Sequence, residues 1–249
     1  MAQWPRASQS KGHALSTLLS PEEIRARVLF RDEALIVLDK PPGLPVHAGS
    51  GRGPTLEASF GALRFEALRP PALAHRLDRD TSGCLVLGRT AASLKRLGGL
   101  FAAGKVEKLY WAVVEGGPAE DEGRIALALA PIDAERHSWR MKTAPEGQEA
   151  ITDYHVLGRH EGRAWLALQP RTGRTHQIRV HCAALGFPVL GDWIYGSAPA
   201  APRRPSDSAL YLHARAVTIP YDGTKPAIRA EAAPPPHMRA PLAALGYTV

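Results

Sequence analysis

The sequence predicts an α+β fold built on a largely antiparallel β-sheet. Many short segments have the length and apolar pattern of strands, and only a few intervening segments have a helical pattern. Strands in such numbers with a few helices among them are typical of this class. The hydrophobic content of 45% in 249 residues is enough for a sizeable core, and no internal repeat is visible.

The first elements follow from capping and periodicity. Ser20 has the features of an N-cap, with Pro21 at the first helical position and Glu23 placed to close a capping box. Residues 1–20 are polar and basic and are expected to form a disordered tail, so residues 21–249 hold the folded domain. The next expected elements are strands near 28–30 and at 35–38, a flexible basic loop at 49–53, and a helix from Thr55 to Leu63.

The rest of the chain alternates strands with three helices. A buried strand at Cys84–Leu87 leads into a helix from Thr90 to Ala103, whose outer cations belong either to a solvated face or to an RNA contact. A second strong helix is expected over Gly173–Leu185, ended by Gly186. Further strands are expected at 108–114, 123–129, 138–143, 150–157, 163–169, 211–219 and 227–231, a Pro/Arg-rich loop at 197–208, and a last helix at 236–245.

Composition narrows the class of protein. The net charge is +7, and the 31 basic residues comprise 24 arginines and 7 lysines, a bias that suits phosphate binding but that a GC-rich genome also produces. Cys84 and Cys182 lie in apolar or helical segments and are expected to be reduced core residues. Neither a secretory signal nor an apolar run of membrane-spanning length occurs, so a cytoplasmic protein is expected.

The segment His75–Gly83 (HRLDRDTSG) is the most informative part of the chain. It places Asp78 between Arg76 and Arg79, directly before a Thr-Ser-Gly turn. An aspartate held on a loop between core elements, beside two cations, is expected to stay ionised and oriented for chemistry. A turn with a surface ion pair is the ordinary alternative for such a pattern.

Five other segments accompany it in order. They are Lys40-Pro41-Pro42-Gly43, Val106–Gly116 with a K-x-Y pattern, Gly173–His181 (GRTHQIRVH), Gly191–Gly196 (GDWIYG) and Leu212-His213-Ala214. Together with HRLDRDTSG, these blocks resemble the RluA-type pseudouridine synthases over about residues 28–235. That family isomerises uridine in RNA to its C-glycoside. The resemblance implies a pseudouridine synthase fold with a mixed sheet in two halves and the active-site cleft between them.

The resemblance also implies roles for individual residues. Asp78 matches the family's catalytic nucleophile, Tyr110 its strand tyrosine, and Arg179 the arginine that pairs with the nucleophile. Tyr110 could stack on the uracil, act as the base, or be a core residue. The residues expected to contact RNA are His75, Arg76, Lys108, Arg174, His176 and Gln177.

No cofactor is expected. A metal site at His176, His181 and Cys182 is disfavoured because the two histidines are five residues apart, and no Walker or GxGxxG loop occurs. Structured RNA, ribosomal or transfer, is the expected partner of a monomer without a membrane partner. The residues before the first strand are too few for an S4 RNA-binding module.

Two other functions fit parts of the pattern. An RNA-binding or chaperone protein could keep the fold without the reaction, but it would need none of Asp78, Tyr110 and Arg179. A carboxylate-dependent hydrolase would need a second catalytic acid, and Asp80, the nearest candidate, is better explained by turn formation.

Overall fold

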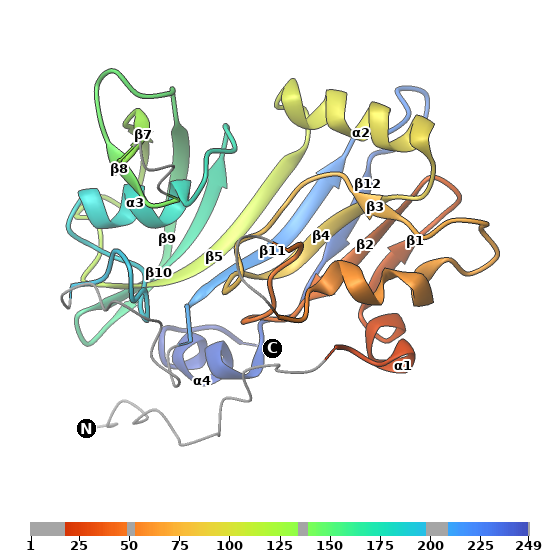
Figure 1. Ribbon diagram of the computed structural model, residues 1–249. Helices are drawn as coiled ribbons and strands as arrows, with labels where there is room; N and C mark the ends of the chain where they lie inside the picture. The colour runs from red at the N-terminus through yellow and green to blue at the C-terminus, as the bar shows by residue number, and fades with distance from the viewer. Residues whose placement is uncertain (1–17, 49–52, 134–138, 198–208, 249) are drawn as a thin grey trace. The chain divides into compact units, whose positions relative to one another are not determined.

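A computed structural model describes residues 18–48, 53–133, 139–197 and 209–248 (Figure 1). These residues form two compact units. The N-terminal unit consists of residues 18–108 and 214–234, and the C-terminal unit of residues 109–213 and 235–248. Among the described residues, no helix is both long and apolar enough to cross a membrane.

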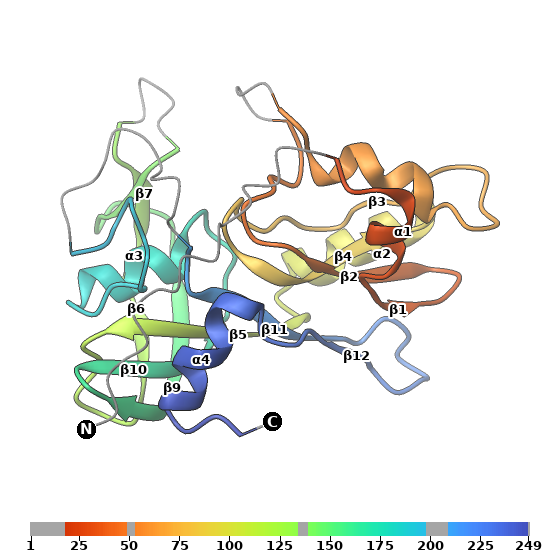
Figure 2. The ribbon, with the colours of Figure 1, turned by 90° about the horizontal axis from the view of Figure 1, so that it is seen from below.

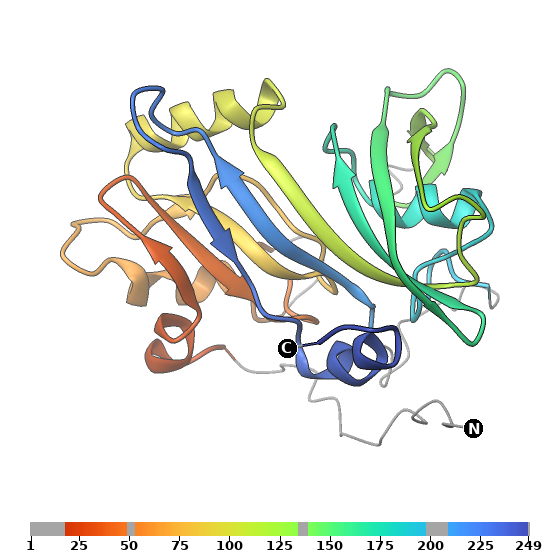
Figure 3. The same cartoon turned by 180° about the vertical axis from the view of Figure 1, so that it is seen from behind.

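The N-terminal unit contains a sheet in which two neighbouring strands are almost entirely buried. Residues 35–38 and all of residues 82–88 are buried, as expected for strands covered on both faces. Neighbouring strands are antiparallel at β1–β2, β2–β4, β3–β4 and β11–β12, the last pair visible in blue in Figure 3. The order is β1 (Val28–Arg31), β2 (Leu35–Lys40), β4 (Ser82–Gly88), β11 (Leu212–Ile219) and β12 (Ile228–Glu231), with β3 (Ala72–Leu73) also on β4.

The helices of this unit are fixed by their caps. Ser20 and Glu23 form the expected capping box of α1 (Pro21–Arg25), and Thr90 and Ser93 form another at the start of α2 (Ala91–Ala102). The helix expected from Thr55 is instead the 3₁₀ helix η1 (Leu56–Leu63), and Thr55 makes no side-chain cap. Without that cap the first turn is held by backbone bonds from Leu56 and Glu57 to Pro45 and Val46.

The C-terminal unit is a four-stranded antiparallel sheet covered on both faces. Alternate residues of β5 lie on opposite faces, so Ala112 and Val114 pack with α3 while Val113 packs with α4 (Figure 2). The order is β5 (Glu107–Glu115), β10 (Arg163–Pro170), β9 (Ile151–His160) and β6 (Glu122–Ala126), beside a hairpin of β7 (Leu129–Pro131) and β8 (Met141–Thr143), with α3 (Gln177–Ala184) and α4 (Pro236–Ala244).

The α+β class with largely antiparallel strands is therefore confirmed. Cys84 and Cys182 are free and buried, also as expected, and burial raises the pKa of each thiol to about 12. Several expectations were wrong: β3 was not expected, the strand at 123–129 divides into β6 and β7, the strand expected at 138–143 begins at Met141, and the helix at Gly173 begins four residues later. The expectations for residues 1–17, 49–52 and 198–208 lie outside the described residues, whereas Leu19, in the expected tail, is buried.

The late start of α3 has a local cause. The Gln177 side-chain oxygen accepts hydrogen bonds from the Thr172 hydroxyl (2.7 Å) and the Arg174 backbone N–H (3.0 Å), which holds residues 172–176 in a loop. His176 then takes the N-cap position in the left-handed region, with φ 53°. Arg174 and His176 consequently lie on a loop and not on the helix that the sequence predicts.

Candidate active site

The Asp78 loop, residues 74–81, connects β3 to β4 in the N-terminal unit. Asp78 is half-buried between the exposed side chains of Arg76 and Arg79, and the Thr81 N–H donates to the Asp78 carbonyl (3.2 Å) to close a turn. Gly83, the second residue of β4, has φ 102°, and a Cβ there would lie 2.2 Å from the Ala214 carbonyl oxygen. The structure thus shows the tight turn that the sequence predicts and why a glycine follows it.

Lys40 joins this loop to the turn that follows β2. Its side chain is fully buried, and its Nζ donates to the carbonyl oxygens of Pro41 (2.7 Å), Leu44 (2.8 Å) and Arg79 (2.9 Å). Gly43 and Arg79 add two bonds across the same junction, from the Gly43 N–H to the Arg79 carbonyl (2.9 Å) and from the Arg79 Nε to the Gly43 carbonyl (3.1 Å). The residue after Asp78 is therefore fixed from two directions.

The protonation state of Lys40 follows from this geometry. Burial lowers the pKa of Lys40 to about 7, and the carboxylates of Asp80 and Asp78 oppose that shift. An ammonium supplies three N–H groups for three carbonyls, whereas a neutral amine supplies two. We infer that the charged form is the one that satisfies the site. Asp80 is buried and acts on this ammonium, which agrees with a structural role for that carboxylate.

His75 fixes the other end of the loop. Its Nε2 accepts a hydrogen bond from the Val86 N–H (2.9 Å), and its ring stacks on Phe101 with centroids 4.6 Å apart. Burial, and secondarily the Lys108 ammonium, lowers the pKa of His75 to about 4. The imidazole is therefore neutral at pH 7 with its proton on Nδ1, a state suited to orienting the loop and not to pairing with phosphate.

Arg179, on α3 of the C-terminal unit, is 3% exposed and forms a buried ion pair. Its Nε and Nη2 donate to the two carboxylate oxygens of Asp192, both at 2.7 Å. Asp192 also accepts from the backbone N–H groups of Ile194 (2.9 Å) and Tyr195 (3.1 Å). The GDWIYG segment belongs to the family resemblance, but no role was expected for Asp192; the structure shows that Asp192 orients Arg179.

Tyr195 supports the same arginine from another side. Its ring lies 5.2 Å from the Arg179 guanidinium carbon, and its hydroxyl accepts from the Met141 N–H (2.9 Å) and bonds His176 Nδ1 (2.7 Å). His176 is thereby held beside the start of α3.

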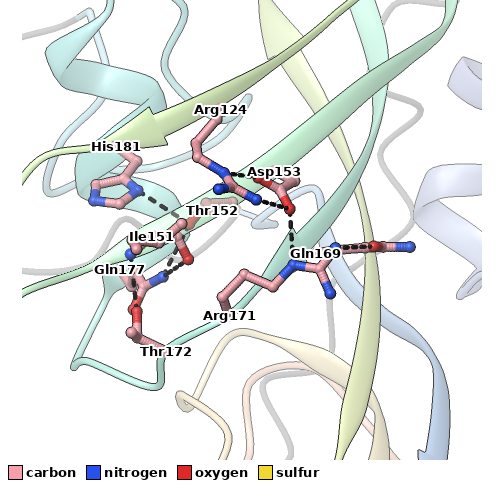
Figure 4. Close-up of polar contacts among 9 residues, drawn as sticks. All are labelled: Arg124, Ile151, Thr152, Asp153, Gln169, Arg171, Thr172, Gln177 and His181. Carbon is pink, nitrogen blue, oxygen red and sulfur yellow. Dashed lines mark hydrogen bonds and ion pairs between the residues drawn. The ribbon is translucent and has the colours of Figure 1, made fainter. Parts of the chain in front are cut away.

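Gln177 and His181 belong to a buried network with Thr152 (Figure 4). The Gln177 Nε2 donates to the Ile151 carbonyl and the Thr152 hydroxyl, both at 2.9 Å, while its oxygen accepts the two loop bonds described above. His181 bonds the Thr152 hydroxyl through Nδ1 (3.0 Å) and the Leu127 carbonyl through Nε2 (2.9 Å). All four bonds of the Gln177 amide are to residues of its own unit, so Gln177 positions the loop that precedes α3.

The remaining expected site residues lie near these groups within their own units. Tyr110 is half-buried on β5 opposite Leu168, on the sheet face that α3 covers. Arg174 is exposed, and its Nε donates to the Glu149 carbonyl (2.9 Å). Lys108 is half-buried, and burial lowers its pKa. Among the described residues, no group of three or more His, Cys, Asp or Glu side chains is placed to hold a metal ion.

Comparison with known proteins gives the family. The model of the RNA pseudouridylate synthase family matches residues 34–184, which include the Asp78 loop, Tyr110 and Arg179. The chain belongs to this family. It is accordingly a pseudouridine synthase, an isomerase whose substrate is RNA.

Individual relatives agree with this assignment. An uncharacterized RNA pseudouridine synthase of Zymomonas mobilis is 42% identical over 83% of this chain and 92% of its own length. Ribosomal large subunit pseudouridine synthase D of Xanthomonas campestris is 34% identical over 92% of this chain and 72% of its own length. The chain spans only 40% of mitochondrial RNA pseudouridine synthase 3 of Arabidopsis thaliana, to which it is 40% identical.

Solved structures show the same fold. Human RNA pseudouridylate synthase domain containing 4 superposes with a TM-score of 0.75 at 26% identity, over 90% of this chain and 95% of that one. Human RNA pseudouridylate synthase domain containing 1 gives a TM-score of 0.69 at 28% identity, over 87% and 86% of the two chains.

The neutral His75 makes the fold sensitive to acid. Because the pKa of His75 is lowered from 6.5 to about 4, the unfolded chain binds a proton between these values that the native state does not. Stability should therefore fall as the pH decreases from about 6.5 to 4, by up to about 3 kcal/mol from this group. Urea unfolding at several pH values should show a smaller acid loss for His75→Phe than for wild type. The control His160→Phe, at an exposed histidine, should keep the wild-type acid loss, and equal pH dependence of His75→Phe and wild type would contradict the assignment.

The Arg179–Asp192 pair should be a strong determinant of stability. Asp192→Asn removes the negative charge from a buried arginine, so we expect a loss of about 3–5 kcal/mol in the free energy of unfolding. Asp153→Asn is the matched control, because Asp153 bridges the exposed Arg124 and Arg171 (Figure 4), where about 1 kcal/mol or less is expected. Equal losses in the two variants, measured by urea unfolding, would show that Asp192 does not stabilise a buried charge.

Proposed function

We propose that this pseudouridine synthase isomerises uridines of ribosomal or transfer RNA with the Asp78 carboxylate as its nucleophile. The observation that carries the proposal is the Asp78 loop itself. It is fixed at one end by neutral His75 and beyond Asp78 by the buried Lys40, while Asp78 remains half-buried and its neighbours Arg76 and Arg79 are exposed. Such a rigid loop presents one carboxylate in a fixed position, flanked by cations that suit the RNA backbone.

The reaction requires few chemical groups. The N1–C1′ bond of uridine breaks, the uracil turns, and C5 bonds to C1′. The proton of C5 leaves and N1 takes up a proton, so the product has the same composition as uridine. Three first steps are open to a carboxylate: it can attack C1′, attack C6 of the ring, or remove a proton from the sugar. All three need the ionised form of Asp78.

Arg179 is the residue we assign to keeping Asp78 ionised. Its Nε and Nη2 bind the Asp192 carboxylate, which fixes the orientation of the guanidinium within the C-terminal unit. The bonds from Ile194 and Tyr195 to Asp192 hold that carboxylate in place. This pairing with Asp78 is a proposal drawn from the family resemblance and from the orientation of Arg179 within its own unit.

The other residues act on the RNA. Tyr110 stacks on the extruded uracil and its hydroxyl removes the C5 proton, while Arg76 enters the space of the flipped nucleotide or holds a phosphate. Lys108, Arg174 and His176 contribute further contacts to the RNA backbone. The excess of arginine over lysine supports such contacts, because guanidinium groups bind phosphate through two parallel hydrogen bonds.

The RNA class is supported by a relative. The Xanthomonas campestris protein is named for the large ribosomal subunit, and this chain matches 72% of its length. Base sequence is not selected by the Asp78 loop, the Arg179–Asp192 pair or Tyr110. The proposal therefore includes both ribosomal and transfer RNA as substrates.

The carboxylate can be tested with a conservative change. Asp78→Asn keeps the size of the side chain and removes its charge, so isomerisation should stop while RNA affinity stays within about tenfold, since phosphate contacts carry most of the affinity. Isomerisation is measured by tritium release from RNA labelled at C5 of uridine, with RNA from cells lacking the gene as substrate. Asp222→Asn, at a half-buried aspartate of the same unit, should remain fully active. Measurable turnover by Asp78→Asn would exclude the nucleophile role.

Tyr110 can be tested with two substitutions. Tyr110→Phe keeps the stacking ring and removes the hydroxyl, so it should bind RNA normally and stall before product. Tyr110→Ala should in addition lose about 1–3 kcal/mol of base stacking. Both are measured under single-turnover conditions, and wild-type rates for Tyr110→Phe would show that the hydroxyl is not the base.

A further inference from the structure

Trp139 is a large aromatic side chain that is both exposed and held in place. It lies two residues before the start of β8, and 52% of the residue is accessible to solvent. Its ring meets the His176 ring edge-on with centroids 5.7 Å apart and lies 6.2 Å from the Trp193 ring, while the Arg140 guanidinium is 5.4 Å from its centre. An indole with this much exposed surface, next to an arginine, is suited to a planar ligand.

The backbone that carries Trp139 is anchored to the C-terminal unit. The Met141 N–H donates to the Tyr195 hydroxyl (2.9 Å), and Met141 and Tyr195 pack against Leu129, Ala150 and Val180. The hairpin of β7 and β8 is therefore attached to α3 immediately beside Trp139. A ligand that stacks on this indole meets a surface that is already in position.

A chain of side-chain contacts connects Trp139 with Arg179. Trp139 contacts His176, the His176 Nδ1 bonds the Tyr195 hydroxyl, and the Tyr195 ring lies under the Arg179 guanidinium. All four residues belong to the C-terminal unit. The exposed indole is thus three contacts from the arginine to which we assign the ionisation of Asp78.

We propose that Trp139 is a stacking platform for an unpaired base of the substrate RNA, next to the uridine that is isomerised. The inference rests on the proposed function for the position of the base, and on the family's RNA substrate for its chemistry. Every nucleobase has an aromatic face, so the platform binds single-stranded RNA without selecting one base. Arg140 and Lys142, on the same segment, supply positive charge for the adjoining phosphates.

Substitution of Trp139 separates stacking from charge. The probe is a short fluorescein-labelled single-stranded RNA of mixed sequence, and its affinity is measured by fluorescence anisotropy. Trp139→Leu should weaken binding by about 5- to 150-fold, the range that one base–aromatic stack supplies, while Trp139→Phe should stay within about threefold of wild type. The dependence of log Kd on log salt concentration should not change, because no phosphate contact is lost.

An abasic RNA of the same length identifies the group that is bound. Wild type and Trp139→Leu should bind it equally, since it has no base to stack. Tyr221→Leu is the matched control: Tyr221 of the N-terminal unit carries Arg96 at 5.1 Å in the same kind of pair, and its replacement should leave RNA affinity unchanged.

Three results would overturn the proposal. If Trp139→Leu binds the mixed-sequence RNA with wild-type affinity, stacking is excluded. If Trp139→Leu loses as much affinity for abasic RNA as for the mixed-sequence RNA, the effect comes from folding or charge. If Trp139→Leu has normal RNA affinity but a sedimentation coefficient that differs from that of wild type, the indole contacts a second copy of this chain. Trp139→Met also lacks an aromatic ring and carries the same test if Trp139→Leu is unfolded. Because anisotropy needs no turnover, failure of the proposed reaction and failure of the stacking platform give different results.

Discussion

The buried ammonium of Lys40 is the interaction on which the candidate site depends. A lysine without solvent contact is tolerated only where each of its N–H groups meets an acceptor, and here the carbonyls of Pro41, Leu44 and Arg79 provide them. These carbonyls come from two loops that are far apart in sequence. The loops must therefore pack against each other for the lysine to be satisfied, and the Asp78 loop cannot relax without leaving a buried charge unpaired. His75 completes the restraint from β4.

The C-terminal unit uses a buried charge in the same way. Arg179 is enclosed and fixed by Asp192, whose remaining acceptor positions are occupied by backbone N–H groups. Tyr195 then links Arg179 to His176 and to the hairpin that carries Trp139. Each unit thus orients one of the two groups to which we assign the chemistry, and a single substitution in either buried network changes both stability and geometry.

Much of this could be predicted from the sequence, because local patterns have local causes. The capping box at Ser20, the glycine at position 83 and the apolar strands are all determined by neighbouring residues. The family resemblance indicates Asp78, Tyr110 and Arg179. Lys40 and Asp192 lie in segments that carry the family resemblance, but their roles could not be predicted. The partners of Lys40 are backbone carbonyls and the partner of Asp192 is a side chain 13 residues away, and neither kind of contact produces a sequence pattern. The start of α3 was misplaced for a similar reason, since the Gln177 amide holds the preceding loop. A lone exposed tryptophan such as Trp139 has no pattern at all.

The central claim is that this chain isomerises particular uridines in ribosomal or transfer RNA. The Lys40 network holds the Asp78 loop and the Asp192 network holds Arg179, each within its own unit. The family defines the reaction, and the identity of the RNA substrate is the part that needs a direct test. The most direct measurement is a transcriptome-wide pseudouridine map of cells lacking the gene, compared with the same cells carrying it again. The account predicts that one or more uridines in ribosomal or transfer RNA lose the modification and regain it on complementation. Identical maps in the two strains would contradict it.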